Sequence, residues 1–299
     1  MSRAPLEILR RHPITSYFVI AYAVTWLFHI PVVLLGLPIS NPETHAPSLY
    51  ILPGIAIGVT GTAFFMTAVT QGKPGVRRLL QRLTTWRVGP QWWAVAVLLI
   101  PVTGIVIGAL LGTPDAVRAF APAALIFYPA AYAAHFIFGP LFEETGWRGF
   151  ALPRMQQRFG PLKATIFLGL LWSAWHFGLC VPMWFGSGDF ASGILQLGMF
   201  VVFTTSMTFL FTWLSNNTRA SLLLCILLHG SVDGSITYLQ VLADKGIISA
   251  EASATVIALG MLIACVAGPL VLTVFTRGKL GYPRYQREAE ALDLPPSHS

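Results

Sequence analysis

The 299-residue chain is far more apolar than a soluble globular protein. Apolar residues make up 55% of it and charged residues only 10%, whereas about a quarter of the residues in soluble domains are charged. The mean hydropathy of +0.67 agrees with this excess. The net charge of +7 does not indicate nucleic-acid binding, because the basic residues are dispersed and form no recognised nucleic-acid module. We therefore expect an integral membrane protein with the lipid bilayer, and no nucleic acid, among its partners.

Long apolar segments predict an all-α fold, a polytopic transmembrane helix bundle. A spanning helix needs about 20 mostly apolar residues. Eight segments satisfy this, namely 14–37, 49–70, 91–112, 120–142, 163–185, 192–214, 221–242 and 253–276. The first is interpreted as a retained helix, because it exceeds the apolar core of a signal peptide and lacks a convincing small-residue cleavage site.

The basic residues support eight crossings. Cytoplasmic loops retain Lys and Arg, and a cytoplasmic amino terminus leaves only Arg118 and Lys245 on the outer side. The other 17 basic residues fall in inner segments within 3–11, 73–87, 148–163, 219 and 277–287. Both termini are therefore expected in the cytoplasm. We expect one membrane domain over residues 1–285 and a disordered polar tail over 286–299.

Few ionisable side chains remain in apolar context, where each is costly and indicates a functional role. The fourth apolar segment runs into Glu143-Glu144-Thr145-Gly146-Trp147-Arg148. Residues four apart share a helix face, so Glu144 can pair with Arg148 while Glu143 points about 100° away. The following sequence stays largely apolar, which indicates that the helix continues and holds Glu143 below the surface. The alternative is that both glutamates mark the cytoplasmic end of the helix.

Histidines and another carboxylate occur inside two later segments. His176 lies roughly 20 Å of helix beyond the preceding basic residue. His229 and Asp233 are four apart in the seventh segment and share a helix face. Imidazoles and carboxylates from separate helices can build a metal site or a general base inside a bundle, although a structural His–Asp pair is also open. His29 and His135 are interpreted as histidines that make hydrogen bonds within the bundle.

The three motifs together resemble those of the CPBP family of intramembrane proteases, which includes the type II CAAX prenyl endopeptidases and relatives linked to bacteriocin maturation and self-immunity. The family pattern is EExxxR, then an aromatic residue three positions before a histidine, then HxxxD/N, on separate transmembrane helices. Here these are residues 143–148, Trp172 with His176, and His229 with Asp233. The resemblance covers the motif-bearing core, 120–242. It implies a multi-pass protein of a bacterial plasma membrane.

The resemblance implies an endopeptidase that hydrolyses a peptide bond in a membrane-associated protein or peptide, with a lipid-modified carboxy terminus as one option for the substrate. Glu143 would be the general base, and His176 would position or activate the water. His229 and Asp233 would hold a divalent metal or the oxyanion side of the site. The candidate metal ligands are Glu143, His176, His229 and Asp233. Zinc suits these donors, and activation of water by glutamate and histidine without a metal is the open alternative.

Supporting roles are implied for Glu144, Arg148 and Trp172. The first two would provide orientation and charge balance around Glu143, and Trp172 replaces the more usual phenylalanine as a large apolar wall. Asp233 stands where prenyl-protein endopeptidases usually carry asparagine. An amide can donate a hydrogen bond to an oxyanion, whereas a carboxylate can do so only when protonated. Asp233 is therefore favoured as a metal ligand or as a residue that orients His229.

Two other classes of function are open on the sequence. A transporter or channel could use the His, Asp and Glu side chains as an ion or proton site. Such a protein would favour repeated halves with corresponding polar sites, whereas here the motif residues all follow residue 142. A non-catalytic immunity or scaffold protein of the same fold is the third possibility.

Overall fold

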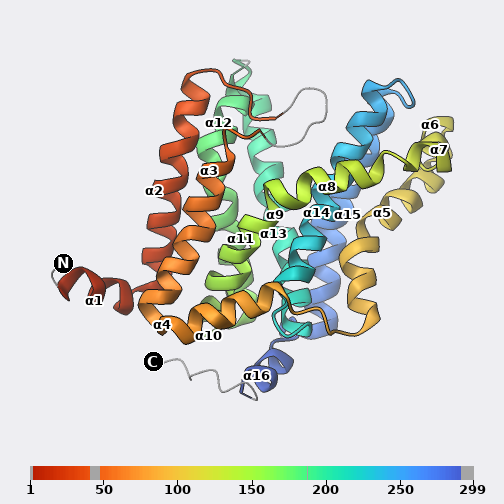
Figure 1. Cartoon of the computed structure of the whole chain (residues 1–299). Helices are drawn as coiled ribbons and strands as arrows, with labels where there is room; N and C mark the ends of the chain where they lie inside the picture. Colours follow the sequence, from red (N-terminus) through yellow and green to blue (C-terminus); the bar gives the residue numbers. More distant parts are fainter. Residues whose placement is uncertain (1–2, 41–47, 187, 291–299) are drawn as a thin grey trace.

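The computed structural model describes residues 3–40, 48–186 and 188–290, which fold into a helical bundle without a β-strand in these ranges (Figure 1). The first half comprises α1 (Arg3–Arg11), α2 (Pro13–Leu34), α3 (Leu52–Ile55), η1 (Ala56–Gly61), α4 (Thr62–Leu83), α5 (Pro90–Leu111), α6 (Pro114–Ala119), α7 (Pro122–Leu125) and α8 (Tyr128–Phe138). The second half comprises α9 (Pro140–Gly146), η2 (Trp147–Ala151), α10 (Leu152–Phe159), α11 (Pro161–Trp175), α12 (Phe177–Phe185), α13 (Phe190–Asn217), α14 (Leu222–Asp244), α15 (Ala250–Thr276) and α16 (Tyr282–Glu290). Segments η1 and η2 are π-helical.

The predicted all-α membrane bundle is confirmed. Among the described residues, six helical stretches are long and apolar enough to cross a membrane, and two bent helix pairs bring the number to eight. The bent pairs are 122–159 and 161–185. Large apolar side chains lie on the outside of the bundle, including Leu110 and Phe275, which are 82% and 83% exposed. Such a surface suits contact with lipid, and the chain is an integral membrane protein.

The arrangement of the ends agrees with an even number of crossings. Helices α1 and α16, which lie near the two termini, are at the same end of the bundle as α10 (Figure 1). The expectation of a disordered tail from residue 286 is wrong for residues 286–290, which belong to α16. An Arg284–Glu288 pair at 2.9 Å and the burial of Tyr285 stabilise this last helix. Residues 291–299 lie outside the described ranges.

Two predicted spans are bent rather than straight. The predicted helix 120–142 breaks at Gly139, and the chain turns by 45° before a helical segment that continues through η2 to Phe159. Pro140 accounts for this break, because the residue before a proline avoids the helical conformation and proline donates no backbone hydrogen bond. The predicted span 163–185 bends by 63° at His176. A side chain at Gly178 would collide with Trp26, so glycine lets α12 pack against α2.

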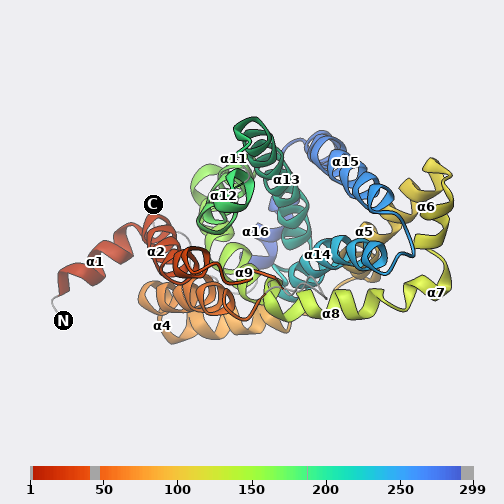
Figure 2. The ribbon, with the colours of Figure 1, turned by 90° about the horizontal axis from the view of Figure 1, so that it is seen from above.

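The core places α14 at the centre and α15 at the periphery. Figure 2 shows α14 beside α5 and α8, and α13 beside α11. Most of α14 is buried, whereas almost none of α15 is. On the opposite side of the core, Tyr17 and Phe18 of α2 pack their rings against Trp147 of η2. The chain approaches α2 and η1 so closely at Gly146 that a β-carbon would collide with Tyr17 and Val59.

Candidate active site

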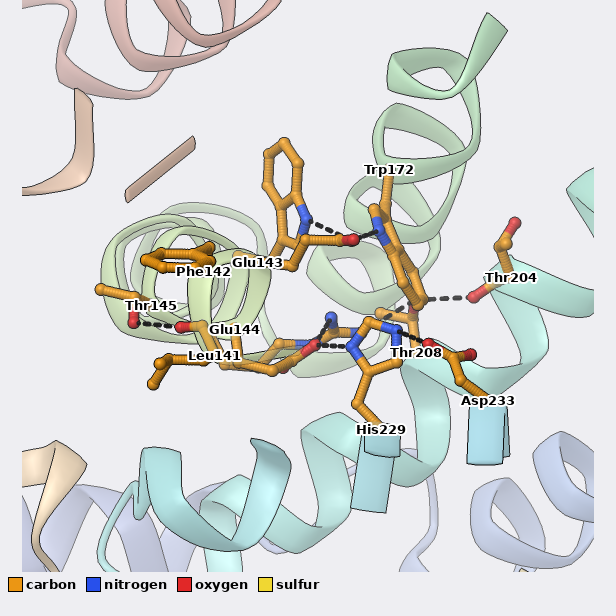
Figure 3. A network of polar contacts seen from close by, with 12 residues as sticks. Leu141, Phe142, Glu143, Glu144, Thr145, Trp172, Thr204, Thr208, His229 and Asp233 are labelled. Carbon is orange, nitrogen blue, oxygen red and sulfur yellow. Dashed lines mark hydrogen bonds and ion pairs between the residues drawn. The ribbon is translucent and has the colours of Figure 1, made fainter. Parts of the chain in front are cut away.

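Five of the sequence-predicted site residues lie close together where α9, α11 and α14 meet, namely Glu143, Glu144, Trp172, His229 and Asp233 (Figure 3). Arg148 pairs with Glu144, and the ring of His176 lies beside Trp172. The first turn of α9 supplies Glu143, where the helix N-terminus favours a carboxylate. The helix continues past Glu144, as the sequence indicated, and the alternative that the glutamates mark a helix end is wrong. The end of α11 supplies Trp172, and α14 supplies His229 and Asp233.

The carboxylate of Glu143 is held on one oxygen. Its Oε2 accepts hydrogen bonds from Nε1 of Trp172 at 2.8 Å and from Nε1 of Trp147 at 3.4 Å (Figure 3). Its Oε1 accepts no hydrogen bond from any residue in the described part of the chain. Glu143 is 6% exposed and lies below the surface, as predicted. The carboxylate is therefore oriented by two indoles and keeps one oxygen for a further partner.

The ring of Trp172 lies beside three other side chains of the site. Its ring centroid lies 4.7 Å from the guanidinium carbon of Arg148 and 5.3 Å from the ring centroid of His229. The ring of His176 lies 5.9 Å away. From the sequence we expected only an apolar wall at this position. The missed signal is that a buried indole needs an acceptor for its N–H group, and Glu143 provides that acceptor.

His176 lies at the bend between α11 and α12 and is partly exposed. Its Nδ1 lies 2.9 Å from the carbonyl oxygen of Trp172. A carbonyl oxygen can only accept, so Nδ1 carries the hydrogen and Nε2 of the neutral ring keeps its lone pair. The ring packs edge-on against Trp175 and Phe200, with centroid distances of 4.6 and 5.0 Å. These contacts orient Nε2 as an acceptor.

Behind Glu143 lies a buried group of charges. Glu144 and Arg148 have fully buried side chains and pair at 2.9 Å, as their spacing predicted. The same Oε1 of Glu144 lies 2.9 Å from Nδ1 of His229. The guanidinium of Arg148 also stacks on Phe211 at 4.1 Å and donates to Thr208 at 3.4 Å. Glu144 thus contacts both Arg148 and His229, and the role of Glu144 and Arg148 in orientation and charge balance stays a prediction.

Asp233 joins two histidines at the more open side of the site. Its side chain is 34% exposed, and Oδ2 lies 3.5 Å from Nε2 of His229. The same oxygen lies 3.9 Å from Nδ1 of His135, whose Nε2 makes a hydrogen bond of 2.7 Å with Thr237. His135 was predicted to make a hydrogen bond inside the bundle and does so, but its approach to Asp233 was not foreseen. His29 likewise makes a hydrogen bond, with the carbonyl oxygen of Ile51 at 3.0 Å.

The predicted metal ligands are not arranged as a metal centre. No group of three or more His, Cys, Asp or Glu side chains in the described ranges is placed to hold a metal ion. Oε2 of Glu143 is occupied by indole donors, and Nδ1 of His229 is occupied by Glu144. Zinc sites use three or four protein ligands, so these donors do not fit a bound zinc ion as they stand. Zinc binding stays a prediction.

Comparison with known proteins identifies the segment that carries the site. Residues 125–235 match the family described as type II CAAX prenyl endopeptidase Rce1-like. Over this segment, the chain is similar to the Rce1-like family. The family resemblance inferred from the three motifs is thereby confirmed, and the Rce1-like segment contains all seven predicted site residues.

The Rce1-like segment also aligns with a curated relative, CAAX prenyl protease 2 from Methanococcus maripaludis. The two are 32% identical in an alignment 119 residues long, and the match covers 36% of this chain and 40% of that protein. The alignment thus spans less than half of the relative's length. Both descriptions, of the family and of the relative, are those of peptidases.

Proposed function

We propose that this protein is an intramembrane endopeptidase in which Glu143 and His176 activate a water molecule. The observation that carries the proposal is the state of the Glu143 carboxylate, which two indoles fix on one oxygen while the other oxygen has no partner among the described residues. His176 contributes a ring nitrogen with a lone pair beside the same tryptophan. The Rce1-like match supports the peptidase class.

In the proposed mechanism, Glu143 is the general base. Oε1 of Glu143 takes a proton from water as the water oxygen forms a bond to the peptide carbonyl carbon. Nε2 of His176 accepts a hydrogen bond from the same water and thereby directs a lone pair toward the carbonyl carbon. When the C–N bond breaks, protonated Glu143 returns the proton to the departing amine nitrogen. Glu143 is thus regenerated at the end of each cycle.

His229 would stabilise the oxyanion of the tetrahedral intermediate. Its Nδ1 faces Glu144 and its Nε2 faces Asp233, and both partners are carboxylates, which accept hydrogen bonds. With a hydrogen on Nε2, His229 can donate to Asp233. The same N–H group can also donate to the oxygen that becomes negatively charged in the intermediate. Loss of one oxyanion donor in a peptidase costs about 10²- to 10³-fold in rate. In this proposal, Asp233 orients the imidazole of His229 by accepting a hydrogen bond from its Nε2–H group.

The proposed substrate is a membrane-associated protein or peptide. The site lies among helices that cross the membrane, so a substrate anchored in the same membrane can reach it by lateral diffusion. The relative's name makes a prenylated carboxy-terminal peptide the first candidate to test. The membrane in which the chain resides, proposed as a bacterial plasma membrane, is to be identified by fractionation.

The test uses the full-length protein reconstituted in liposomes with a fluorogenic peptide, in prenylated and unprenylated forms. We expect Glu143→Gln and His176→Ala to lower the cleavage rate at least 10²-fold, because general-base catalysis contributes about 10²- to 10⁴-fold. Glu251→Gln, an exposed glutamate on α15, is the matched control and should retain full activity. Full turnover by Glu143→Gln would contradict the proposal. Ion flux without cleavage would favour a transporter, and peptide binding without cleavage would favour a scaffold.

A further inference from the structure

A cavity of about 1170 Å³ lies at the end of the bundle that carries α1, α10 and α16. Its walls come from α1 and the start of α2, from α4 and the loop that follows it, from α10, from the short connection before α14, and from α16. None of Glu143, His176, His229 and Asp233 lines it. The cavity is therefore separate from the candidate active site, although Gly149 of η2 forms part of its wall.

The cavity carries a large excess of positive charge. Eight arginines line it, against a single acidic side chain, Glu288, among the lining residues that the structure describes. None of these arginines forms an ion pair with a carboxylate in the described ranges. Glu288 itself pairs with Arg284, and its Oε2 is buried without a hydrogen-bond partner. Like charges held this close repel one another, so an anionic occupant would be stabilised.

Four of the arginines donate hydrogen bonds to backbone carbonyls, and two of these, Arg82 and Arg154, are half-buried. Arg82 donates to the carbonyl oxygens of Ala220, Gly149 and Arg148 at 2.8, 2.8 and 2.7 Å. Arg154 donates to the carbonyl oxygen of Phe150 at 2.9 Å, and its guanidinium carbon lies 3.7 Å from the centroid of that phenylalanine ring. A guanidinium has five N–H donors, so Arg82 keeps donors for a ligand after these three bonds. The wall of the cavity is thus built before any ligand arrives.

The chemistry and the position of the cavity indicate a phosphate group carried by a lipid. Guanidinium groups match phosphate oxygens in planar, paired hydrogen bonds. Basic pockets at the cytoplasmic ends of membrane helices are suited to anionic headgroups. Trp86 lines the cavity and is 57% exposed, as expected for a tryptophan at the level of lipid headgroups. We propose that this cavity binds the phosphate headgroup of an anionic phospholipid.

Arg82 connects the proposed lipid site with the helix that carries the EExxxR motif. Its acceptors Arg148 and Gly149 both belong to η2, and Arg148 pairs with Glu144. An anion in the cavity offsets the repulsion between Arg82 and its neighbours, so the guanidinium stays on these carbonyls. Bound lipid should therefore raise the thermal stability of the folded protein, and this effect can be measured without any assay of cleavage.

The experiment measures lipids retained by the purified full-length protein in native mass spectrometry, from mixed micelles that contain phosphatidylglycerol or phosphatidylcholine. We expect the wild type to retain phosphatidylglycerol at least tenfold better than phosphatidylcholine and to unfold at a higher temperature with it. The variant Arg78→Gln/Arg158→Gln removes two charges from the cavity and should lose this preference. The matched control Arg77→Gln/Lys163→Gln removes two charges from the same predicted cytoplasmic face but outside this cavity, and it should behave as the wild type.

Two further arms keep the test decisive. Glu288→Gln preserves all the arginines and removes the acidic lining residue, so it should increase retention of phosphatidylglycerol even if the double arginine variant fails to fold. Equal loss of retention in the cavity pair and the control pair would overturn the proposal, since it would show general surface attraction. Inorganic phosphate that raises the unfolding temperature as much as phosphatidylglycerol does, at equal concentration, would overturn the assignment to a lipid.

Discussion

Trp172 is the residue that contacts most of the other side chains of the candidate site. Its indole nitrogen fixes the Glu143 carboxylate, its backbone carbonyl fixes the tautomer of His176, and its ring supports Arg148 and His229. A phenylalanine at this position would keep the wall and the carbonyl but not the indole donor. Replacing Trp172 by phenylalanine therefore distinguishes its packing role from its role in positioning the carboxylate of Glu143.

Trp172→Phe should leave the fold intact and lower the cleavage rate. A hydrogen bond to a charged group contributes about 1.5 to 3 kcal/mol, so we expect a loss of about 10- to 100-fold in kcat with a smaller change in KM. The control is Trp92→Phe, because Nε1 of Trp92 is buried without a hydrogen-bond partner. Steady-state kinetics check this prediction, and unchanged kcat in Trp172→Phe would show that the ring is only an apolar wall.

Treatment with a chelator and elemental analysis test the zinc prediction. The donors are not assembled around a metal position in the described structure, so we expect cleavage to persist after treatment with a chelator. Elemental analysis of the wild type and of Asp233→Asn gives an independent readout. One equivalent of zinc in the wild type, lost in Asp233→Asn together with activity, would show that Asp233 and its neighbours rearrange to bind a metal.

At the level of elements, local sequence predicted the helices, and it contained a signal for only one of their two bends. Apolar runs of about 20 residues were sufficient to locate the spans. The break at Gly139 has a local cause in Pro140, so it was open to prediction. The bend at His176 accompanies the packing of Gly178 against Trp26 of a distant helix, and no local pattern reports it. The approach of His135 to Asp233 is likewise a result of packing between α8 and α14.

Gly146 tests the packing that positions α9 and η2. A methyl group at this position would collide with Tyr17 and Val59, which are fully buried. Overpacking of this kind typically costs about 1 to 3 kcal/mol, so Gly146→Ala should lower the thermal unfolding midpoint in detergent and reduce cleavage. Gly198→Ala is the control, because a β-carbon there meets no atom within 4 Å. Equal midpoints for the two variants would contradict this account of the packing.

At the level of the whole molecule, the distribution of charge and the fold agree. The end of the bundle that carries α1, α10 and α16 also carries the arginine-lined cavity. The connection between α14 and α15, which contains Lys245, lies at the opposite end of the bundle. The count of basic residues had already implied this asymmetry. What the sequence could not provide was the convergence of those arginines on one cavity, since they come from segments as distant as residues 10 and 219.

The orientation in the membrane is tested with cysteine reporters at two exposed basic positions. Lys245→Cys should react with a membrane-impermeant thiol reagent added to intact cells, and Arg77→Cys should react only after permeabilisation. The reason is that cytoplasmic loops retain basic residues. The background variant lacking the native cysteines is the control for labelling. Labelling of Arg77→Cys in intact cells would invert the proposed topology.

The helix breaks at Gly139 and His176 have a consequence for the solvent inside the membrane. In a bilayer, backbone that leaves the helical conformation is tolerated where protein covers it or where water reaches it. Both breaks adjoin the candidate site, one just before Glu143 and the other at His176 itself. Water is therefore expected to reach the chain at these two breaks, and the proposed hydrolysis of a peptide bond within the membrane would require it there.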